Sequence, residues 1–374
     1  MKSKDRLIHL FASLLGTLGY PWRKPRDKSF LIVSTTGIGD TLWGVPAIRA
    51  LRQTYPEAYI AVLTKPLGAE LLKCNPDIDK ILTIRRGLRA LPDAIPLIGS
   101  LFARRFSTVL VFHVSERIIW PLVLLAGAPR VIGAAGAFKH MDRLLTEPVG
   151  GLEDLHFIDR RLSLVARAGA HTKDKSLALY LDEQAVQEAD KFMAQRGLVD
   201  KKTPLLGLHP GAKDYYKCAP PERFIEAGAR LAEKYGLAVV VLGGTDDQRL
   251  CAKVAASIPG AVDASGALSV RGSGALMKRL KLFITNDTGP MHMAFALGVP
   301  TVALFGPTLS KYNGPVEVEA VRVLSVPRTC EPCLTRKCKT PRCLEALSTE
   351  QIVSAAEGLM SGTDFGLTTR GTSI

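Results

Sequence analysis

The chain has 374 residues, of which 47% are hydrophobic and 22% charged, and its formal net charge is +14. This length exceeds one ordinary hydrophobic core and predicts two domains of roughly 150 residues each, while the composition excludes a disordered chain. The positive charge favours anionic partners, but only 6% of residues are aromatic and no nucleic-acid motif is found, so phosphorylated substrates or acidic lipids are favoured over nucleic acid.

Residues 1–28 form a basic amphipathic segment. An apolar stretch at residues 7–20 lies between two groups of basic residues, and Leu7, Leu10, Phe11 and Leu14 share one helical face. The stretch is shorter than the roughly 20 apolar residues that span a bilayer, and no A-x-A-like cleavage site follows it. Two interpretations remain open: an interfacial helix on an anionic membrane, which we favour, and a helix packed on the protein's own surface.

Residues 29–170 alternate between strand and helix patterns. The expected strands are 29–35, 59–63, 80–84 and 108–112, and the expected helices are 45–55 and 67–74. Such alternation predicts parallel β-α-β units and an α/β fold. The pattern loosens between about residues 170 and 203, which places a domain joint there.

The alternation restarts in the second half of the chain. The expected strands are 205–209, 238–242, 282–285 and 301–305, and the expected helices are 221–235, 246–258 and 348–360. The predicted domains are therefore residues 29–180 and 181–345, followed by a C-terminal helix and a Gly-, Thr- and Ser-rich tail within residues 346–374, of which 361–374 are expected to be disordered. Ligands bind at the carboxyl ends of strands in such sheets, so the cleft between two domains is the expected site.

A glycine turn after the first strand carries an acidic residue. Gly37 and Gly39 allow a tight turn, but Leu42 replaces the third glycine of the dinucleotide fingerprint, and no phosphate-loop lysine follows. Asp40 stands where a phosphate would normally rest. Local sequence favours a helix cap for this carboxylate over a general base in the cleft.

The segment Asn286–His292 follows a strand and opens a helix. Pro290 suits a first helical turn, and the free N–H groups and dipole of a helix start favour a diphosphate, with Thr288 and Gly289 in the cradle. Two interpretations stay open for Asp287, a sugar hydroxyl partner or a cap. Two also stay open for His292, a phosphate contact or a packed core residue.

Two further strand ends carry candidate donor residues. Gly211 lies in the loop after the strand at 205–209, and Lys217 beyond it is a candidate phosphate partner, although most lysines are simply solvated. Gly243 follows the strand at 238–242 and borders either a nucleoside pocket or a plain turn capped by Asp246.

Four of the seven cysteines crowd together near the C-terminus. Cys330, Cys333, Cys338 and Cys343 have a spacing that suits a structural zinc or iron site, with reduced thiols or a labile disulfide as alternatives. The uneven distribution of the cysteines is not that of a secreted disulfide scaffold, which favours a reducing, cytoplasmic compartment.

Four segments together resemble glycosyltransferase family 9, the lipopolysaccharide heptosyltransferase family. They are Thr-Gly-Ile-Gly-Asp-Thr-Leu at 36–42, Leu-His-Pro-Gly-Ala at 208–212, Asn-Asp-Thr-Gly-Pro-Met-His-Met-Ala at 286–294, and Gly-Val-Pro-Thr-Val-Ala-Leu-Phe-Gly-Pro-Thr at 298–308. The resemblance extends from Phe30 to about Ala356. It implies the GT-B fold, in which two Rossmann-like domains with parallel sheets face a central cleft, the acceptor on the N-terminal domain and the nucleotide sugar on the C-terminal domain.

The resemblance also implies roles for single residues. Asp40 matches the catalytic base, which reverses the local preference for a cap, and Lys217 matches the lysine that meets the donor's phosphates. The donor set is completed by residues of the helix start and of two glycine turns: Asp287, Thr288, Gly289, His292, Gly211 and Gly243. Cys218-Ala219-Pro220 departs from the family, which commonly has an aromatic residue or His near the lysine.

The acceptor side is expected to include Gly39, Thr41, Arg85 and Arg86, with Arg89, Arg104 and Arg105 as further candidates for acceptor phosphates; a solvated charged face is the alternative. The resemblance implies an inverting sugar transfer, with ADP-heptose favoured as donor and a lipid-linked, phosphorylated saccharide as acceptor. It requires no catalytic cofactor. The expected location is the inner face of the plasma membrane, as a peripheral protein.

Two other functions compete with this hypothesis. A Rossmann-type oxidoreductase is disfavoured by the broken glycine fingerprint. A non-catalytic nucleotide-sugar-binding protein remains possible on the same fold, because a fold does not prove activity.

Overall fold

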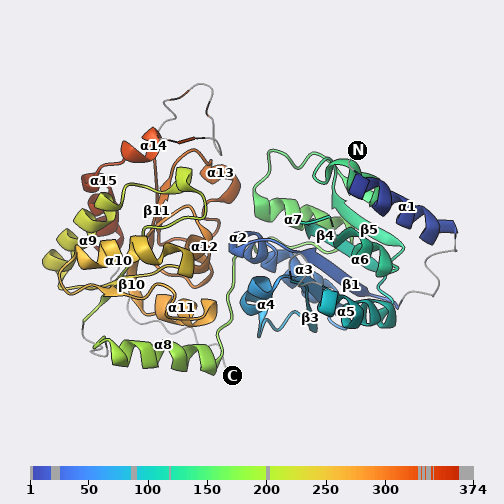
Figure 1. Cartoon of the computed structure of the whole chain (residues 1–374), viewed down its shortest axis with the longest axis horizontal. Coiled ribbons are helices and arrows are strands. Elements are labelled where there is room, and N and C mark those ends of the chain that lie inside the picture. Colours follow the sequence, from blue (N-terminus) through green and yellow to red (C-terminus); the bar gives the residue numbers. More distant parts are fainter. Residues whose placement is uncertain are drawn as a thin grey trace. The chain divides into compact units, whose positions relative to one another are not determined.

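The computed structural model describes residues 3–17, 26–85, 91–117, 119–198, 203–326, 330, 333, 338–339 and 341–361. The chain divides into two compact units, Met1–Tyr180 (unit 1) and Leu181–Ile374 (unit 2). Figure 1 shows unit 1 in blue to green and unit 2 in green to red.

Unit 1 is built on a six-stranded sheet in the order β3-β2-β1-β4-β5-β6, with every pair parallel. Its strands are β1 (Ser29–Ser34), β2 (Tyr59–Thr64), β3 (Lys80–Thr83), β4 (Thr108–His113), β5 (Arg130–Ala134) and β6 (Glu147–Val149). Its helices are α1 (Ser3–Thr17), α2 (Ile38–Leu42), α3 (Val45–Thr54), α4 (Pro66–Leu72), α5 (Leu91–Arg104), α6 (Ile119–Leu125), the 3-10 helix η2 (Lys139–Leu144) and α7 (Phe157–Arg167).

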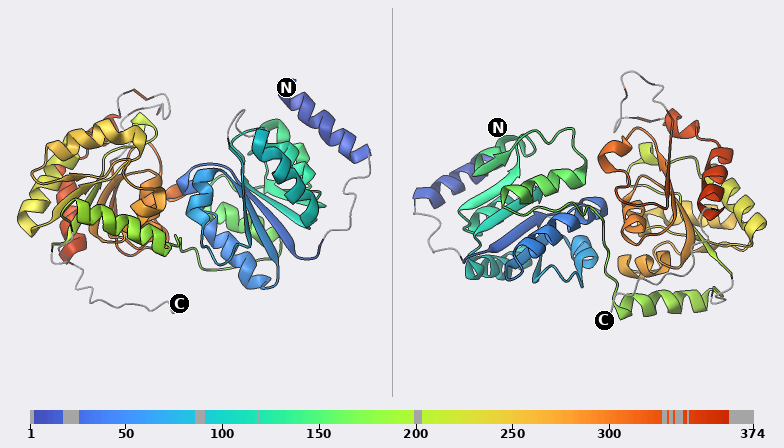
Figure 2. Two further views of the ribbon diagram at one scale, coloured as in Figure 1. Left: turned by 60° about the horizontal axis from the view of Figure 1, so that its bottom comes forward. Right: turned by 180° about the vertical axis from the view of Figure 1, so that it is seen from behind.

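The strands of unit 1 are buried on both faces, which explains their continuous apolar sequences. Because side chains alternate along a strand, Leu31 and Val33 of β1 pack with α5 and α6, while Phe30 and Ile32 pack with α3 and α7. Ile8 of α1 joins the α5 and α6 side. Figure 2 shows α1 as the outermost helix of unit 1.

Unit 2 repeats the architecture with the sheet order β12-β11-β10-β7-β8-β9, again wholly parallel. Its strands are β7 (Leu205–His209), β8 (Ala238–Val241), β9 (Val262–Asp263), β10 (Leu280–Asn286), β11 (Thr301–Phe305) and β12 (Val321–Ser325). Its helices are α8 (Glu183–Gln195), η3 (Tyr215–Lys217), α9 (Pro221–Tyr235), η4 (Thr245–Asp247), α10 (Gln248–Ala256), α11 (Val270–Met277), α12 (Gly289–Ala296), α13 (Ser310–Asn313), α14 (Arg342–Glu345) and α15 (Thr349–Ser361).

The main core of unit 2 lies between its sheet and the helices α9, α10 and α15. Leu208, Ile284 and Leu304 of the sheet meet Phe224 of α9 and Ile352 of α15 there. The C-terminal helix therefore completes the core of unit 2. The expected tail falls at residues 362–374, outside the described residues.

The N-terminal helix exists, but its packing face differs from the predicted apolar face. Ile8 is buried, whereas Leu7, Leu10 and Leu14 are 65%, 58% and 53% exposed. The helix thus rests on unit 1 while its leucines point outward. In the described part of the chain, every helix is too short or too polar to cross a bilayer.

Candidate functional site

Each sheet has one point at which the strand order reverses, so that the strands on its two sides are added in opposite directions. In unit 1 the reversal lies between the neighbouring strands β1 and β4, and in unit 2 it lies between β7 and β10. Loops at the carboxyl ends of such neighbouring strands diverge, and open α/β sheets bind ligands there. Asp40 follows β1, and Lys217 and Asp287 follow β7 and β10.

Asp40 lies in the short helix α2 and does not cap it. The N-cap is Gly37, which has no side chain to donate or accept. The Asp40 carboxylate instead accepts a hydrogen bond from the Arg161 guanidinium, with 2.8 Å between Oδ1 and the nitrogen. The Asp40 side chain is 29% exposed, whereas that of Arg161 is 4% exposed. The Asp40 carboxylate is therefore bound by a buried cation while part of its side chain remains exposed to solvent.

Arg161 is fixed by contacts on several sides. It donates to the Phe157 carbonyl at 2.8 Å, and its guanidinium lies 5.4 Å from the centroid of the Trp43 ring. Trp43 in turn packs against the ring of Phe157 at 4.7 Å. Burial lowers the pKa of Arg161, and the nearby Asp40 carboxylate opposes that shift. Sequence reasoning missed Arg161, because nothing in α7 marks it before the fold brings it to Asp40.

Two more titratable groups stand at the same edge of the sheet in unit 1. Lys65 directly follows β2 and forms an ion pair with Glu116 at 2.9 Å. His113 ends β4, and burial lowers its pKa, while Asp40 raises it and Arg161 lowers it. These shifts place His113 within electrostatic reach of the Asp40–Arg161 pair. The rule that ligands gather at strand ends could have found both residues from the sequence.

The expected acceptor residues are not gathered into one patch. The Thr41 hydroxyl donates to the Gly37 carbonyl of its own helix at 3.0 Å and is buried, while Gly39 accepts from the Trp43 N–H. Arg85 is engaged by Asp93 through two side-chain hydrogen bonds of 2.9 and 2.8 Å.

The other arginines predicted to bind acceptor phosphates are Arg86, Arg89, Arg104 and Arg105. Arg86 and Arg89 fall outside the described residues. Arg104 and Arg105 precede β4, at the amino edge of the sheet, whereas Arg85 follows β3 at the carboxyl edge. The predicted single basic patch is therefore wrong for Arg104 and Arg105, since the two groups occupy opposite edges.

In unit 2, Lys217 and Asp287 form an ion pair with 2.7 Å between Nζ and Oδ2. Asp287 is 2% exposed and also accepts hydrogen bonds from the Thr308 hydroxyl at 2.6 Å and the Asn313 amide at 2.8 Å. Burial alone would raise the pKa of Asp287, but Lys217 and the hydroxyl of Thr308 hold that pKa below its ordinary value. Asp287 therefore anchors an ammonium at the strand edge and is not the cap of α12.

The first turn of α12 has no side-chain cap in the described part of the chain. Thr288 is the N-cap but its side chain makes no capping hydrogen bond, and Gly289 and Pro290 form the first turn. His292 is 3% exposed and lies edge-on to Phe295 at 5.9 Å, which supports the packed interpretation. Its charge nevertheless contributes to lowering the pKa of Asp287.

Gly211 and Gly243 converge on Asp247. A Cβ atom added to Gly211 would collide with the Asp247 carboxylate. One added to Gly243 would collide with the Cys251 sulfur and contact the Asp247 Cβ tightly, so both positions need the bare backbone. Asp247, and not Asp246 as predicted, accepts the Gly244 N–H at 3.1 Å and closes this turn.

Asn286 ties the loop after β7 to the end of β10. Its side chain donates to the Pro210 carbonyl at 2.8 Å and accepts from the Ala219 N–H at 3.1 Å. Next to it, burial raises the pKa of the Cys218 thiol to about 11, so Cys218 is a neutral thiol there.

The four clustered cysteines are all free thiols. Burial raises the pKa of Cys343, and the neighbouring Cys333 and Cys338 add to that effect. Within the described parts of the chain, however, no three His, Cys, Asp or Glu side chains are placed to hold a metal ion. The structure therefore does not assemble the expected tetrathiolate site.

Comparison with known proteins agrees with this arrangement. The model of glycosyltransferase family 9 (heptosyltransferase) matches residues 121–344. Lipooligosaccharide heptosyltransferase 2 of Campylobacter jejuni is 24% identical over 338 residues, which cover 87% of this chain and 96% of the relative.

Two solved structures share the fold. The family 9 glycosyltransferase of Veillonella parvula matches with a TM-score of 0.80 and 23% identity over 91% of this chain and 99% of its own. The E. coli heptosyltransferase WaaC with ADP-2-deoxy-2-fluoro heptose matches with a TM-score of 0.68 and 16% identity over 88% of this chain and 99% of its own. Because the family model covers more than half of the sequence, this chain belongs to glycosyltransferase family 9 and is a glycosyltransferase of the GT-B fold.

Proposed function

We propose that the protein transfers heptose from ADP-heptose, with inversion, to a lipid-linked, phosphorylated saccharide in the synthesis of lipopolysaccharide core or a related glycan. The observation that carries this proposal is the Lys217–Asp287 pair beside the uncapped start of α12. A nucleoside diphosphate is the ligand that such a site suits. Two of the similar proteins support the choice of sugar and nucleotide. One is a lipooligosaccharide heptosyltransferase, and the other is a heptosyltransferase whose structure contains an ADP-heptose analogue.

Residues 181–345 would bind the donor. A lysine ammonium has three donors, so the bond to Asp287 leaves others for phosphate oxygens. The N–H groups of Gly289 and Met291 at the start of α12 add a positive helix end on which the diphosphate would rest. Gly211 and Gly243 lie in the loops after β7 and β8, which border this site, and allow those loops to pack closely against Asp247 and Cys251.

Residues 29–180 would bind the acceptor, with Asp40 as general base. The acceptor oxygen bonds to the anomeric carbon while the bond from that carbon to the diphosphate oxygen breaks. Asp40 takes the hydroxyl proton, and the electron pair of the broken bond leaves with the nucleoside diphosphate, whose charge Lys217 and α12 stabilise. A single direct displacement inverts the anomeric carbon. Arg161 orients the carboxylate in this scheme, and no step is assigned to a metal ion.

We also propose that the protein is cytoplasmic and binds the inner face of the plasma membrane. The acceptor is lipid-linked in this proposal, the net charge is +14, and α1 carries outward leucines. An anionic leaflet suits both features.

A structural zinc or iron ion at Cys330, Cys333, Cys338 and Cys343 is a subordinate proposal. The sequence spacing supports it, while the described side chains are not assembled for ligation. Metal analysis of the purified protein tests it. Stoichiometric zinc or iron is the expected result, and its absence contradicts this part of the proposal alone.

A non-catalytic nucleotide-sugar-binding protein is the alternative function. It shares the donor site, so only turnover separates it from the transferase. The position of Asp40, partly exposed and held by a buried arginine, favours catalysis.

The donor proposal is tested by calorimetric titration of a panel of ADP- and UDP-sugars into wild type and Lys217→Ala. We expect ADP-heptose to bind most tightly and Lys217→Ala to weaken that binding at least roughly tenfold, because a charge-assisted hydrogen bond to phosphate contributes about 1.5–3 kcal/mol. Lys234→Ala, which removes a surface lysine paired with Glu357, is the control and should bind like wild type. Binding of no nucleotide sugar, or equal binding by Lys217→Ala, contradicts the proposal.

A further inference from the structure

A pocket of about 490 Å³ lies at the amino edge of the sheet in unit 1, away from Asp40. Its lining comes from the residue before β1 and from the C-terminal half of α5 and the residue after it: Arg26, Pro96, Gly99, Ser100, Ala103, Arg104 and Arg105. Asp40 follows the opposite end of β1, and six strand residues span about 20 Å. The pocket therefore does not belong to the site at the carboxyl edge.

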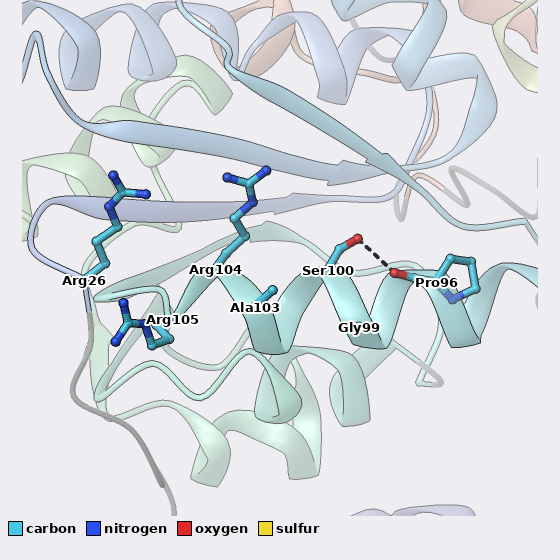
Figure 3. A pocket seen from close by; sticks show the side chains of 7 residues that line it. All are labelled: Arg26, Pro96, Gly99, Ser100, Ala103, Arg104 and Arg105. Carbon is cyan, nitrogen blue, oxygen red and sulfur yellow. Dashed lines mark hydrogen bonds between the residues drawn. The ribbon is translucent and has the colours of Figure 1, made fainter.

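Three arginines stand together at one end of this pocket (Figure 3). Among the described residues, no carboxylate forms an ion pair with any of them, and the pocket lining contains no acidic residue. Asp79 acts electrostatically on the same Tyr59 side chain as Arg104 and Arg26, but it is paired with Arg52. Three guanidiniums without a carboxylate partner are a site for a phosphate group.

The backbone holds these arginines in place. The Arg26 N–H donates to the Arg105 carbonyl at 2.8 Å, and the Ser29 hydroxyl donates to the same carbonyl at 3.2 Å. Arg105 has a φ of 52°, a conformation in which glycine or asparagine is usual. The Arg104 guanidinium lies 4.6 Å from the centroid of the Tyr59 ring. The main chain that carries the arginines is therefore held by hydrogen bonds at Arg26 and Arg105.

Beside the arginines, the pocket is lined by Pro96, Gly99, Ser100 and Ala103. Leu97 and Leu101 of α5 are buried in the core, so Pro96, Gly99 and Ala103 face away from the sheet. The Ser100 hydroxyl donates a hydrogen bond to the Pro96 carbonyl at 2.8 Å (Figure 3). A ligand lying along α5 would meet these small residues beside the arginines.

The N-terminal helix exposes apolar side chains on the same face of unit 1. Ile8 of α1 belongs to the same core cluster as Leu97 and Leu101 of α5, so both helices cover one face of the sheet. Leu7, Leu10 and Leu14 point away from that cluster and are more than half exposed. α1 packs on α6, which in turn packs on α5, so the exposed leucines and the basic pocket belong to one helical layer. Exposed apolar side chains and basic side chains on one face are the pattern of a surface that docks on an anionic bilayer.

We propose that the pocket at Arg26, Arg104 and Arg105 binds the phosphate headgroup of an anionic phospholipid, while the leucines of α1 enter the interfacial region of the bilayer. This face then docks unit 1 on the membrane, and the proposal rests on the proposed function only in assuming that the acceptor is lipid-linked. Charge complementarity selects the lipid, because the arginines face an anionic leaflet.

The experiment is co-flotation of the full-length protein with vesicles of phosphatidylcholine alone or with added phosphatidylglycerol. The test variant combines Arg26→Gln, Arg104→Gln and Arg105→Asn; the hydrogen bonds at Arg26 and Arg105 are made by main-chain atoms and survive, and asparagine suits the positive φ. The control combines Lys191→Gln, Lys278→Gln and Arg322→Gln, which removes the same charge from exposed sites in unit 2.

We expect wild type and the control to bind phosphatidylglycerol vesicles equally, and the test variant to bind roughly 10- to 100-fold more weakly. Added salt should remove most of the difference. Equal binding by the test variant and the control overturns the proposal. Failure of wild type to float, with calorimetric binding of inorganic phosphate that the test variant lacks, would assign the arginines to a soluble anion and also overturn it.

The leucines are tested separately by Leu7→Ser, Leu10→Ser and Leu14→Ser in one chain. Weaker binding to both kinds of vesicle is expected, and unchanged binding contradicts the role of α1. No nucleotide sugar is present in these assays, so their failure is distinct from failure of the proposed transferase activity, which the calorimetric titration measures.

Discussion

Arg161 is a fully buried cation whose partner, Asp40, is partly exposed. Removing a guanidinium from water is costly unless its charge and N–H groups are matched. The carboxylate of Asp40 matches the charge, and that carboxylate and the carbonyl of Phe157 each accept one hydrogen bond, while the Nε–H has no partner among the described residues. The Trp43 ring covers the guanidinium. The arrangement fixes the direction of the Asp40 side chain, so Arg161 is a positioning residue in the proposed mechanism.

Replacing Arg161 with methionine tests this role. Methionine keeps much of the volume and leaves no buried charge, while Asp40 stays solvated and loses its orientation. We expect kcat to fall about 100-fold, with little change in donor affinity, because small misplacement of a reacting group has effects of that size. Arg161→Lys should restore part of the activity.

The control is Arg49→Met, which breaks the ion pair of Arg49 with Asp174 in the same unit, away from Asp40. Steady-state kinetics and calorimetry supply the two readouts. A parallel loss of kcat in Arg49→Met, or normal kcat in Arg161→Met, would argue against a positioning role.

Single residues could be placed from the sequence where a local pattern marks them. Asp40, Lys217 and Asp287 follow buried strands, and the structure has them at the carboxyl edges of their sheets. Their partners could not be placed: Arg161 lies 121 residues from Asp40, and its helix carries no local signal. The cap predicted from local sequence for Asp40 is wrong because the tertiary ion pair takes the carboxylate away from the helix end.

At the scale of the elements, the turns after β7 and β8 are packed around one carboxylate. A Cβ atom at Gly211 would displace the Asp247 carboxylate, and one at Gly243 would displace the Cys251 sulfur and contact the Asp247 Cβ tightly. Asp247 also accepts the Gly244 N–H at 3.1 Å. The two loops that border the proposed donor site are therefore coupled through Asp247.

Gly211→Ala should push Asp247 aside and weaken its bond to Gly244. We expect a loss of about 1–3 kcal/mol in the free energy of unfolding, the range for overpacking a tight site. Gly358→Ala provides the contrast, because Gly358 lies exposed in α15 with open space around it. That change should stabilise by about 0.5–1 kcal/mol. Urea unfolding measures both, and a stabilising Gly211→Ala would refute the packing argument.

The predicted strands of both halves are present with small shifts at their ends, because β-branched apolar runs bounded by turns identify buried parallel strands. The helix α8 at Glu183–Gln195 was not predicted. Its buried face uses Ala185, Ala189 and Phe192, and alanines give a weak periodic signal. The short or weakly apolar strands β5, β6, β9 and β12 were also missed.

On the scale of the whole molecule, the two units repeat one plan. Each sheet reverses its strand order beside a strand that ends in histidine, His113 for β4 and His209 for β7. Burial lowers the pKa of both side chains. The repetition of the sheet order could be expected from the two α/β sets, whereas the two buried histidines emerge only when the strands are paired.

These histidines predict acid sensitivity. Above the ordinary histidine pKa of 6.5, both folded and unfolded chains carry neutral side chains and stability is unaffected. As pH falls below 6.5, the unfolded chain binds protons that the folded chain does not, so the free energy of unfolding decreases. Each histidine contributes up to about 1.4 kcal/mol per pH unit.

The two units can be observed separately, because all three tryptophans, Trp22, Trp43 and Trp120, lie in unit 1. The urea transition followed by tryptophan fluorescence should lose part of its dependence on pH between about 6.5 and 5 in His113→Asn, and keep it in His209→Asn. An unchanged slope in His113→Asn would contradict the assignment of a lowered pKa to that residue.

The most direct test of the account is sugar transfer by wild type and Asp40→Asn, with donor affinity measured on the same preparations. Asparagine retains an oxygen for Arg161 but cannot take a proton at neutral pH. The account predicts transfer with inversion by wild type, and a rate roughly 100- to 10,000-fold lower in Asp40→Asn at unchanged donor affinity. Near-normal transfer by Asp40→Asn would contradict the central claim that this carboxylate is the base.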